Sequence, residues 1–413
     1  MRFLLLNQTF YPDVMATGQY LTDLALGLVE RGHDVTVVTS RRAYDEPQIR
    51  FPKVELWRGI RIYRVASTGF GKGSKCRRAV DFASFSALAA MRLAVLQRHD
   101  VVLALTSPPL ISFFGACLAK VRGCRFFYWV MDFNPDEAIA AGWLRPGSFP
   151  ARMLEWMSRF SLRSASKIIA LDRFMRDRIM AKGIAAKRVV VLPPWAHDGD
   201  VCLDPEGRER FRKQHGLDGK FVVMYSGNHS PCHPLDTLLD SARKLAGDTE
   251  IVFCFIGGGT EFRKIQWMVE NQRAENGHSP APHPPISNIL CLPYQPLKLL
   301  SASLSAADLH VVVMGDPFVG LVHPCKIYNI LCVAAPVLYI GPRPSHLSEM
   351  LDSLADNHVF AAVGHGEAER VVQEIQRIRQ VTANVAQQAT IDISLAFSKA
   401  TIMPKLVAIL ESS

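Results

Sequence analysis

Two histidines and a cysteine crowd into the stretch SGNHSPCHPLDTLL, near the middle of the chain. His229, Cys232 and His233 are residue types that bind zinc. Pro231 and Pro234 interrupt any helix across this stretch, so the three side chains cannot share one helical face as in an H-E-x-x-H site. Their spacing also matches no standard zinc pattern. We therefore expect no metal here, and a zinc site completed by distant ligands is the weaker alternative.

The same stretch fits a loop that binds phosphate. Pro234 suits the first position of a helix, which would place His233 at or near the N-cap, beside backbone N–H groups that have no partner within the helix. Gly227 and Asn228 lie just before, at the end of an apolar run. We predict that this loop binds an anion.

The stretch GDPFVGLVHPCKIYNIL repeats the order of strand end, loop and helix, with Pro324 opening the helix. Lys326 in its first turn would oppose the helix dipole, which is reasonable if a phosphate binds there. An exposed lysine that tolerates this small penalty is the alternative. The same stretch carries His323 and Cys325, either of which is a distant residue that could complete the alternative zinc site.

Two more strand ends could bind anions. The turn IGGGT places Gly257, Gly258 and Gly259 between an apolar run and a helical pattern, an arrangement that can cradle phosphate although it matches neither the dinucleotide nor the P-loop motif. Thr17 and Gly18 open a helix after the first apolar run, where N–H groups attract anions. A tight glycine turn and a threonine cap are the plainer alternatives.

One carboxylate follows a strand in the first half of the chain. Asp132 in WVMDFNPD comes directly after an apolar run. A carboxylate at a strand end could orient or deprotonate a substrate hydroxyl. It could equally brace a loop or cap a helix, because aspartate is a common cap.

Alternating apolar runs and helical patterns must position these residues. Strand patterns such as RFLLLNQ, HDVTVVTS and RFFYWVMD alternate with helices up to Trp195, which predicts some six parallel strands. Residues 196–218 are typical of a linker, and a second series from FVVMYSG to APVLYIG follows. The tail, residues 371–410, is predicted to be helical with a break near Pro404. We predict an α/β fold of two doubly wound Rossmann-like domains facing across a cleft, with ligands beyond the strand ends.

Composition excludes several classes. The 413 residues are 49% hydrophobic and 21% charged, which is typical of globular domains. Nine scattered cysteines without C-x-x-C fit free thiols in a cytoplasm. The first residues do not match a signal peptide, and prolines interrupt the apolar run at 101–119, so we expect no membrane span. No nucleic-acid-binding motif is present.

The net charge of +9 lies in one half. Residues 1–200 hold 29 Lys and Arg against 17 Asp and Glu, whereas the remainder is slightly acidic. The segment 69–95 brings Lys72, Lys75, Arg77 and Arg78 beside phenylalanines, which suits docking on an anionic membrane surface. An anionic substrate or a merely solvated basic surface are the alternatives.

Taken together, these stretches resemble a family 4 glycosyltransferase, the retaining kind with the GT-B fold that uses sugar nucleotides. The resemblance extends over essentially the whole chain and includes FYPDVMATGQYLTDLALGLVERGHDVTVVTS, FVVMYSGNHSPCHPLDTLLDSARKL, IVFCFIGGG and GLVHPCKIYNILCVAAPVLYIGP. The branch of bacterial surface-polysaccharide enzymes, which often act on polyprenyl-linked acceptors, is the most similar.

This resemblance implies transfer of a hexosyl group, or an amino sugar, from a nucleoside-diphosphate sugar to a glycan or lipid-linked acceptor. It implies an acceptor-binding domain at 1–196, a donor-binding domain at 197–385 and a helix at 386–413 that crosses back. No metal or other cofactor is expected, and a cytoplasmic location, peripheral on the membrane, would follow.

The resemblance also assigns roles to residues. Asp132, Lys326 and His233 would be catalytic, and Thr17, Gly18 and Gln19 would form the acceptor and diphosphate loop. The expected donor-binding residues are Gly227, Asn228, His229, His233, Gly257, Gly258, Gly259, Pro293, Tyr294, Leu321, Val322, Cys325, Lys326 and Asn329, of which Pro293 and Tyr294 would hold the base.

The chain departs from the family pattern at the diphosphate. Asn228 and His233 stand where many members carry Arg and Lys, and Leu321 and Asn329 stand where many carry two glutamates. PCKIY instead matches a P-S-K-x-Y pattern, with Cys for Ser. Our hypothesis is that Lys326 and His233 share the diphosphate charge, with His233 as a cation that is lost as the pH rises past neutral.

Two other functions stay open from the sequence. A nucleoside-diphosphate-sugar epimerase or hydrolase could use the same scaffold. A sugar-nucleotide-binding subunit with weak catalysis would explain the two missing glutamates.

Overall fold

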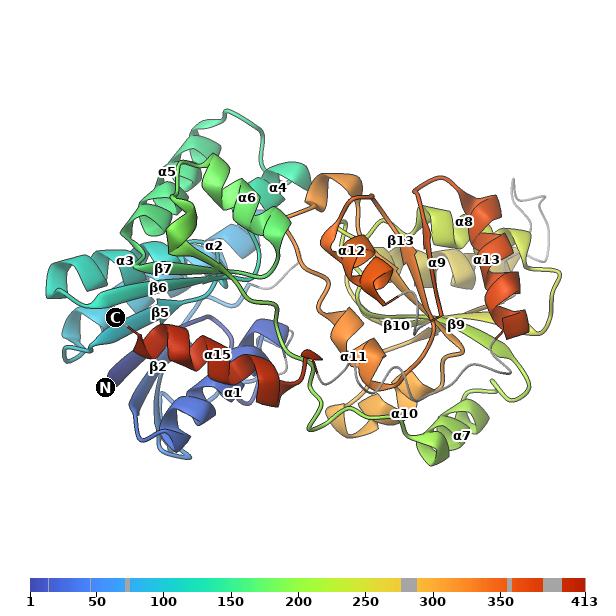
Figure 1. The fold of residues 1–413 in the computed structure, drawn as a ribbon, viewed down its shortest axis with the longest axis horizontal. Helices are drawn as coiled ribbons and strands as arrows, with labels where there is room; N and C mark the ends of the chain where they lie inside the picture. The colour runs from blue at the N-terminus through green and yellow to red at the C-terminus, as the bar shows by residue number, and fades with distance from the viewer. Residues whose placement is uncertain are drawn as a thin grey trace. The chain divides into compact units, whose positions relative to one another are not determined.

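The computed structural model describes residues 1–13, 15–44, 46–70, 75–275, 288–354, 359–381 and 396–412. The chain forms two compact units (Figure 1). Unit 1 comprises Met1–Pro194, Gly320–His323 and Ile402–Ser413, and unit 2 comprises Trp195–Val319 and Pro324–Thr401. The predicted pair of doubly wound α/β domains is confirmed. Within the described residues, no helix is both long and apolar enough to cross a membrane.

Unit 1 is built on a sheet with the order β3-β4-β2-β1-β5-β6-β7-β8, in which only the β3–β4 pair is antiparallel. Its strands are β1 (Arg2–Leu6), β2 (Asp34–Ser40), β3 (Val54–Trp57), β4 (Ile60–Val65), β5 (Val101–Ala104), β6 (Arg125–Val130), β7 (Lys167–Ala170) and β8 (Val189–Val191). The central strands are buried because helices cover both faces, and this is why they are continuous apolar runs.

Six helices of unit 1 follow its strands. They are α1 (Ala16–Glu30), α2 (Lys75–Val95), α3 (Ile111–Arg122), α4 (Asp136–Ala140), α5 (Phe149–Ser164) and α6 (Arg173–Ala181). The strand order reverses between β1 and β5, and such a switch point is where open α/β sheets bind ligands. Residues 71–74 of the basic segment at 69–95, including Lys72, lie outside the described residues, and residues 75–95 form α2.

Unit 2 has an all-parallel sheet with the order β11-β10-β9-β12-β13-β14. Its strands are β9 (Phe221–Asn228), β10 (Ile251–Gly258), β11 (Ile289–Leu292), β12 (Leu309–Val313), β13 (Val337–Ile340) and β14 (Phe360–Val363). Its helices include α7 (Pro205–Gln214), α8 (Asp236–Lys244), α9 (Thr260–Glu275), α10 (Leu300–Ser305), α11 (Lys326–Cys332), α12 (His346–Ser353) and α13 (Ala368–Val381). Here the order reverses between β9 and β12, the two strands that precede the His233 loop and the Lys326 loop.

The predicted linker at 196–218 contains a helix. The carboxylate of Asp204 accepts a hydrogen bond from the Gly207 N–H and so caps α7. Charged residues dominate this short helix, which is why its sequence resembles a linker.

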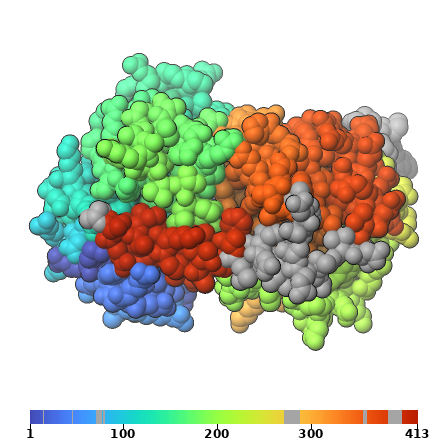
Figure 2. All heavy atoms as spheres, viewed as in Figure 1, coloured from blue at the N-terminus to red at the C-terminus, as the bar shows by residue number. Residues whose placement is uncertain are grey.

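The tail ends in α15 (Lys399–Glu411), which runs through Pro404 instead of breaking there as predicted. From Ile402 onward it belongs to unit 1, where Glu411 accepts hydrogen bonds from Arg31 (2.9 Å) and His33 (2.8 Å). Met403 packs against Gly27 of α1, where a Cβ would come within 2.8 Å of its methyl group. In the space-filling view, α15 (red) lies beside the blue amino-terminal residues (Figure 2). Residues 386–395 of the predicted crossing segment lie outside the described part.

Candidate active-site residues in the two units

Glycines allow β9 and β10 to run side by side to their last residues. Gly257 has a φ of +138°, and a Cβ there would lie 2.0 Å from the carbonyl oxygen of Gly227. Gly227 itself has a φ of +124°, and its missing side chain leaves space for Lys326, whose Nζ lies 3.3 Å from the ideal Cβ position. Two of the predicted glycines therefore bring the strand ends together and make room for a lysine.

Lys326 is the first residue of α11, and its ammonium group is buried at these strand ends. Nζ lies 3.5 Å from the centre of the Tyr225 ring, and it has no hydrogen-bond acceptor among the described residues. Burial lowers the pKa of Lys326 to about 7. An ammonium that is buried without an acceptor is costly, and such a group is explained when an anionic ligand completes its environment.

His233 bridges the loop after β9 and the end of β12. Its Nδ1–H donates to the carbonyl of Val313 (2.7 Å), and its backbone N–H donates to Ser230. Burial, helped by the nearby charge of Lys326, lowers the pKa of His233 to about 3. In the free protein His233 is therefore neutral at pH 7, which contradicts our hypothesis that it is a cation near neutral pH.

His229 is part of the core. Its ring is completely buried between Tyr225 and Phe262, and its Nδ1–H donates to Gly227 (2.8 Å). Burial and the charge of Lys326 lower the pKa of His229 to about 3. This side chain holds the loop and presents no surface to a donor, in contrast to our prediction.

The zinc cluster, which was the weaker alternative from the sequence, does not assemble from the described residues of this loop. Among the described residues, His229, Cys232 and His233 do not form a group of ligand atoms close enough to share a metal ion. Both histidines instead donate their Nδ1–H groups to backbone carbonyls. A neutral imidazole can bind a metal only through the nitrogen that carries no hydrogen. The Nδ1 atoms of His229 and His233 are therefore not available as metal ligands.

The two prolines do not open helices. α8 begins at Asp236 with Leu235 as its N-cap, two residues later than predicted. α11 begins at Lys326 with Cys325 as its N-cap, so Pro324 also lies outside the helix. Neither N-cap side chain accepts a hydrogen bond from its helix. Both prolines lie in the loops that precede the helices.

Among the other predicted donor-binding residues of unit 2, some are exposed and one makes a structural hydrogen bond. Pro293 and Tyr294 follow β11 and are exposed, and the Tyr294 ring covers Gly258. Asn228 is exposed at the end of β9. The side-chain oxygen of Asn329, however, accepts a hydrogen bond from the His197 N–H (3.1 Å) and so braces the chain at the start of the unit.

In unit 1, two aspartates occupy equivalent places at neighbouring strand ends. Val130 of β6 pairs with Ala170 of β7, so Asp132 and Asp172 each lie two residues beyond the pair. Burial raises the pKa of the Asp132 carboxyl to about 6, and nearby His323 opposes that rise. The Asp132 N–H donates to the hydroxyl of Thr106 (3.3 Å).

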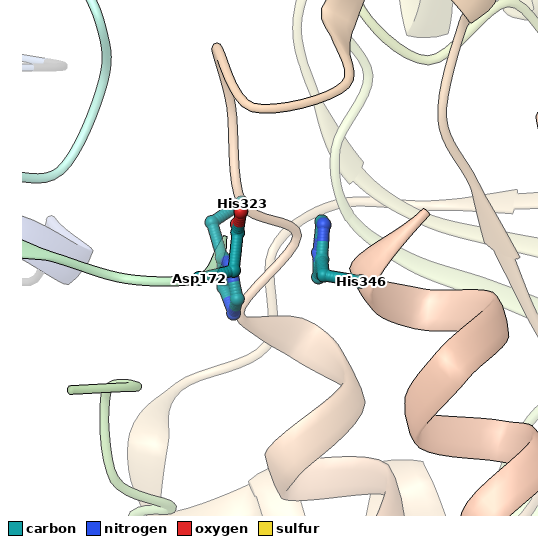
Figure 3. A group of neighbouring side chains, drawn as sticks. All are labelled: Asp172, His323 and His346. Carbon is teal, nitrogen blue, oxygen red and sulfur yellow. The ribbon is translucent and has the colours of Figure 1, made fainter. Parts of the chain in front are cut away.

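Asp172 and His323 form a buried hydrogen-bonded pair that our sequence analysis did not predict. Nδ1 of His323 lies 2.9 Å from Oδ2 of Asp172, with both side chains at most 7% exposed (Figure 3). The other oxygen of Asp172 accepts from the Met175 N–H (2.8 Å) and caps α6. The only signal in the sequence was the equal placement of two aspartates after two strands.

The loop that carries His323 is fastened to the same strand ends. The Phe133 N–H donates to the Leu321 carbonyl (2.8 Å). Gly320 has a φ of +71°, and a Cβ there would lie 2.7 Å from the backbone of Phe174. Leu321 and Val322, which we predicted to contact the donor, are therefore buried members of unit 1.

Thr17, Gly18 and Gln19 lie in the first turn of α1, against the end of β1. The Thr17 hydroxyl lies 3.1 Å from that of Thr9 and accepts from the amide of Asn7 (3.4 Å). A Cβ at Gly18 would lie 3.1 Å from the backbone of Thr9, so this glycine allows the helix to approach the strand end. The sequence analysis missed the polar partners Asn7 and Thr9.

Comparisons with known proteins agree with this architecture. A model of the Glycosyl transferase 4-like domain matches residues 16–195. The chain is 24% identical over 371 residues, 86% of each protein, to the Escherichia coli (strain K12) protein assigned to colanic acid biosynthesis as the glycosyl transferase WcaI.

Solved structures share the fold. Sucrose-phosphate synthase of Thermosynechococcus elongatus has a TM-score of 0.73 at 14% identity, covering 99% of this chain and 98% of that one. HepE of Anabaena, in complex with UDP-glucose, has a TM-score of 0.69 at 16% identity, with each chain covered completely. The chain therefore shares the GT-B fold of these solved structures, and within it residues 16–195 are similar to the Glycosyl transferase 4-like domain.

Proposed function

We propose that the protein transfers a hexosyl group, or an amino sugar, from a nucleoside-diphosphate sugar to a glycan or polyprenyl-linked acceptor in surface-polysaccharide synthesis, with retention of the anomeric configuration. The observation that carries this proposal is Lys326, an ammonium group that is buried at glycine-lined strand ends without a hydrogen-bond acceptor. The similarity to WcaI, and to a protein solved with UDP-glucose, supports the choice of substrates.

Lys326 would stabilise the leaving group. When the bond between the anomeric carbon and the diphosphate breaks, negative charge develops on the departing phosphate oxygen. A positioned ammonium stabilises this charge more strongly in a buried place than in water. The diphosphate would in turn raise the pKa of Lys326 and keep it charged.

His233 would contribute to diphosphate binding in a different way from the one we expected. Because its Nδ1–H is held by Val313, the neutral ring has a lone pair on Nε2 and cannot donate to a phosphate from that atom. It becomes a donor only if the arriving diphosphate raises its pKa enough for a second proton to bind. We therefore assign the resting positive charge to Lys326 alone.

A thermal-shift assay tests the donor site. UDP, GDP and ADP are added separately to the wild type and to Lys326→Met, each with and without EDTA. We expect one nucleotide to raise the Tm of the wild type but not of the variant, with no effect of EDTA. Lys264→Met, at an exposed lysine of α9, is the control. Equal stabilisation of Lys326→Met would refute the assigned role of Lys326.

The reaction itself needs separate tests. The enzyme is incubated with the nucleotide sugar selected above and a polyprenyl phosphate or oligosaccharide acceptor. NMR of the product then determines the anomeric configuration of the new bond. Release of free sugar without acceptor would identify a hydrolase, and a changed sugar in the recovered donor would identify an epimerase. Tight binding without any turnover would identify a binding subunit.

We further propose a cytoplasmic protein that is peripheral on the membrane, with α5 as its docking surface. Phe149, Met153 and Trp156 are 79%, 45% and 60% exposed, and their spacing places them on one stripe of α5. The eight cysteines whose side chains the structure describes are free thiols, which supports a reducing compartment.

Basic residues flank the stripe on α5. A surface cavity of about 400 Å³ beside it is lined by four cations, Arg152, Arg159, Arg178 and Lys182. The only acid of the helix, Glu155, is already paired with Arg159 and Lys182. Exposed aromatic and aliphatic side chains flanked by basic residues favour an anionic bilayer over a neutral one.

A further inference from the structure

We propose that His323 is a further catalytic residue, which exchanges the acceptor proton with Asp132, and that Asp172 is the residue that positions it. This inference rests on the proposed transfer reaction. It begins from topology: Asp132 and Asp172 follow the paired ends of β6 and β7. The loop 320–323 places the His323 imidazole against Asp172, and its Leu321 carbonyl accepts from the N–H of Phe133, the residue next to Asp132.

The place of His323 is defined by several independent contacts. Gly320 can approach the Phe174 backbone only because it lacks a side chain, and the Leu321 carbonyl is held by the Phe133 N–H. Phe133 is the neighbour of Asp132, and Phe174 lies two residues after Asp172. The loop is therefore fastened at the same two turns that carry the carboxylates.

Asp172 determines the tautomer of His323. A carboxylate can only accept, so Nδ1 of His323 carries the hydrogen in the 2.9 Å contact. The second oxygen of Asp172 is committed to the α6 cap, which prevents the carboxylate from turning away. Nε2 is then the nitrogen of His323 that gains and loses a proton.

His323 and Asp132 are suited to share one proton. Burial favours the neutral form of Asp132, whereas the imidazole favours its anion. Tyr128 of β6 also interacts with Asp132, and burial raises the pKa of this phenol to about 12, so it stays neutral. A single proton can therefore move between Asp132 and His323 without changing the net charge of the buried cluster, in which Asp172 remains anionic.

In the reaction, the acceptor O–H would lose its proton to the Asp132 carboxylate. The acceptor oxygen then bonds to the anomeric carbon while the bond from that carbon to the diphosphate breaks. Asp132 passes the proton to Nε2 of His323, and the imidazolium, stabilised by Asp172, releases it when the product leaves. No further reactant is required.

The test uses Asp172→Asn in the full-length protein. The amide oxygen can still cap α6, because asparagine and aspartate are about equal as N-caps. The amide N–H, however, can donate to Nδ1 of His323 and so favours the tautomer with hydrogen on Nε2. We expect kcat to fall at least tenfold with an unchanged KM for the donor, and a shifted acid limb of the pH profile.

Asp204→Asn is the matched control. Asp204 caps α7 in the same way, by accepting a hydrogen bond from the Gly207 N–H. None of the described interactions joins Asp204 to a histidine. It should lower stability as much as Asp172→Asn does while leaving kcat and the pH profile unchanged. A loss of kcat in both variants to the same degree would mean that Asp172 acts only through folding.

A second measurement does not depend on turnover. Nitrogen NMR of labelled histidines, with His323 assigned by comparison with His323→Gln, reports its tautomer and the chemical shift of its Nε2. We expect the Nδ1–H tautomer in the wild type, its reversal in Asp172→Asn, and a shifted Nε2 resonance in Asp132→Asn. An unchanged tautomer in the first variant and an unchanged Nε2 resonance in the second would overturn the inference, even if transfer is confirmed. If no donor is turned over, the proposed function fails, and these spectra still decide whether the three groups share a proton.

Discussion

Nζ of Lys326 lies 3.5 Å from the centre of the Tyr225 ring, so an aromatic face takes the place of a carboxylate partner. Such a contact offsets only part of the cost of burying an ammonium group, which is why the pKa of Lys326 is lowered to about 7. A carboxylate there would neutralise the lysine and repel a diphosphate. The ring leaves the charge available for an anionic ligand, at a cost in stability.

We predict that Lys326→Met stabilises the free protein at pH 6 to 7. The pKa of this lysine is lower in the folded than in the unfolded chain, so the unfolded state binds more protons between pH 7 and about 10.4. The penalty is therefore complete below pH 7 and disappears as the pH rises toward 10. We expect a gain on the order of 2 kcal/mol in urea unfolding at pH 6.5. A less stable variant at that pH would contradict a costly buried charge.

We predict that nucleoside-diphosphate affinity falls as the pH rises above 7. Above that pH the free Lys326 loses its proton, and binding must restore it, so Kd should rise up to tenfold per pH unit until the pKa of the complex is reached. Calorimetry between pH 6.5 and 9, in buffers of different ionisation enthalpy, measures both Kd and proton uptake. His233→Gln should keep the slope, because His233 is neutral throughout this range. A slope that vanishes in this variant would restore His233 as the titrating cation.

The order of strands and helices could be predicted because both sheets are buried on two faces. Parallel strands such as β1 and β6 are then continuous apolar runs, and the ligand-binding residues follow them. The prediction failed where elements are short or half-polar. β3 was missed because it is an edge strand of four residues with alternating exposure, and β14 is equally short.

The site was predictable in its positions but not in its charges. Gly227, Gly257 and Lys326 were found because strand ends and glycines are visible in the sequence. The neutral state of His233 depends on burial, which no local pattern reveals. His323 and Asp172 are 151 residues apart, and only the fold brings them together.

We predict that Gly257→Ala is strongly destabilising. A Cβ at this position would lie 2.0 Å from the Gly227 oxygen, and the φ of +138° disfavours any L side chain. Strain and displacement of β9 together should cost about 3 kcal/mol or more in the free energy of unfolding. Gly247→Ala is the control, because a Cβ there meets no atom within 4 Å. Equal unfolding midpoints in urea for the two variants would show that the strand ends can separate.

We predict that α5 binds anionic bilayers through its apolar stripe. In a vesicle flotation assay, the wild type should bind vesicles containing phosphatidylglycerol at least tenfold more strongly than phosphatidylcholine alone. Phe149→Ser with Trp156→Ser should abolish binding to both, because these rings would enter the interface.

Two further pairs of substitutions separate the electrostatic from the apolar contribution to vesicle binding. Arg152→Gln with Arg159→Gln should remove the preference for anionic lipid and leave the weak binding to phosphatidylcholine. Val54→Ser with Leu56→Ser is the matched control, since these side chains on β3 are 59% and 74% exposed in the same unit. If this control loses binding as the α5 variant does, attachment is a general effect of apolar surface. If the wild type and the control do not bind vesicles, and only the α5 variant loses a protein partner, the stripe is a protein interface.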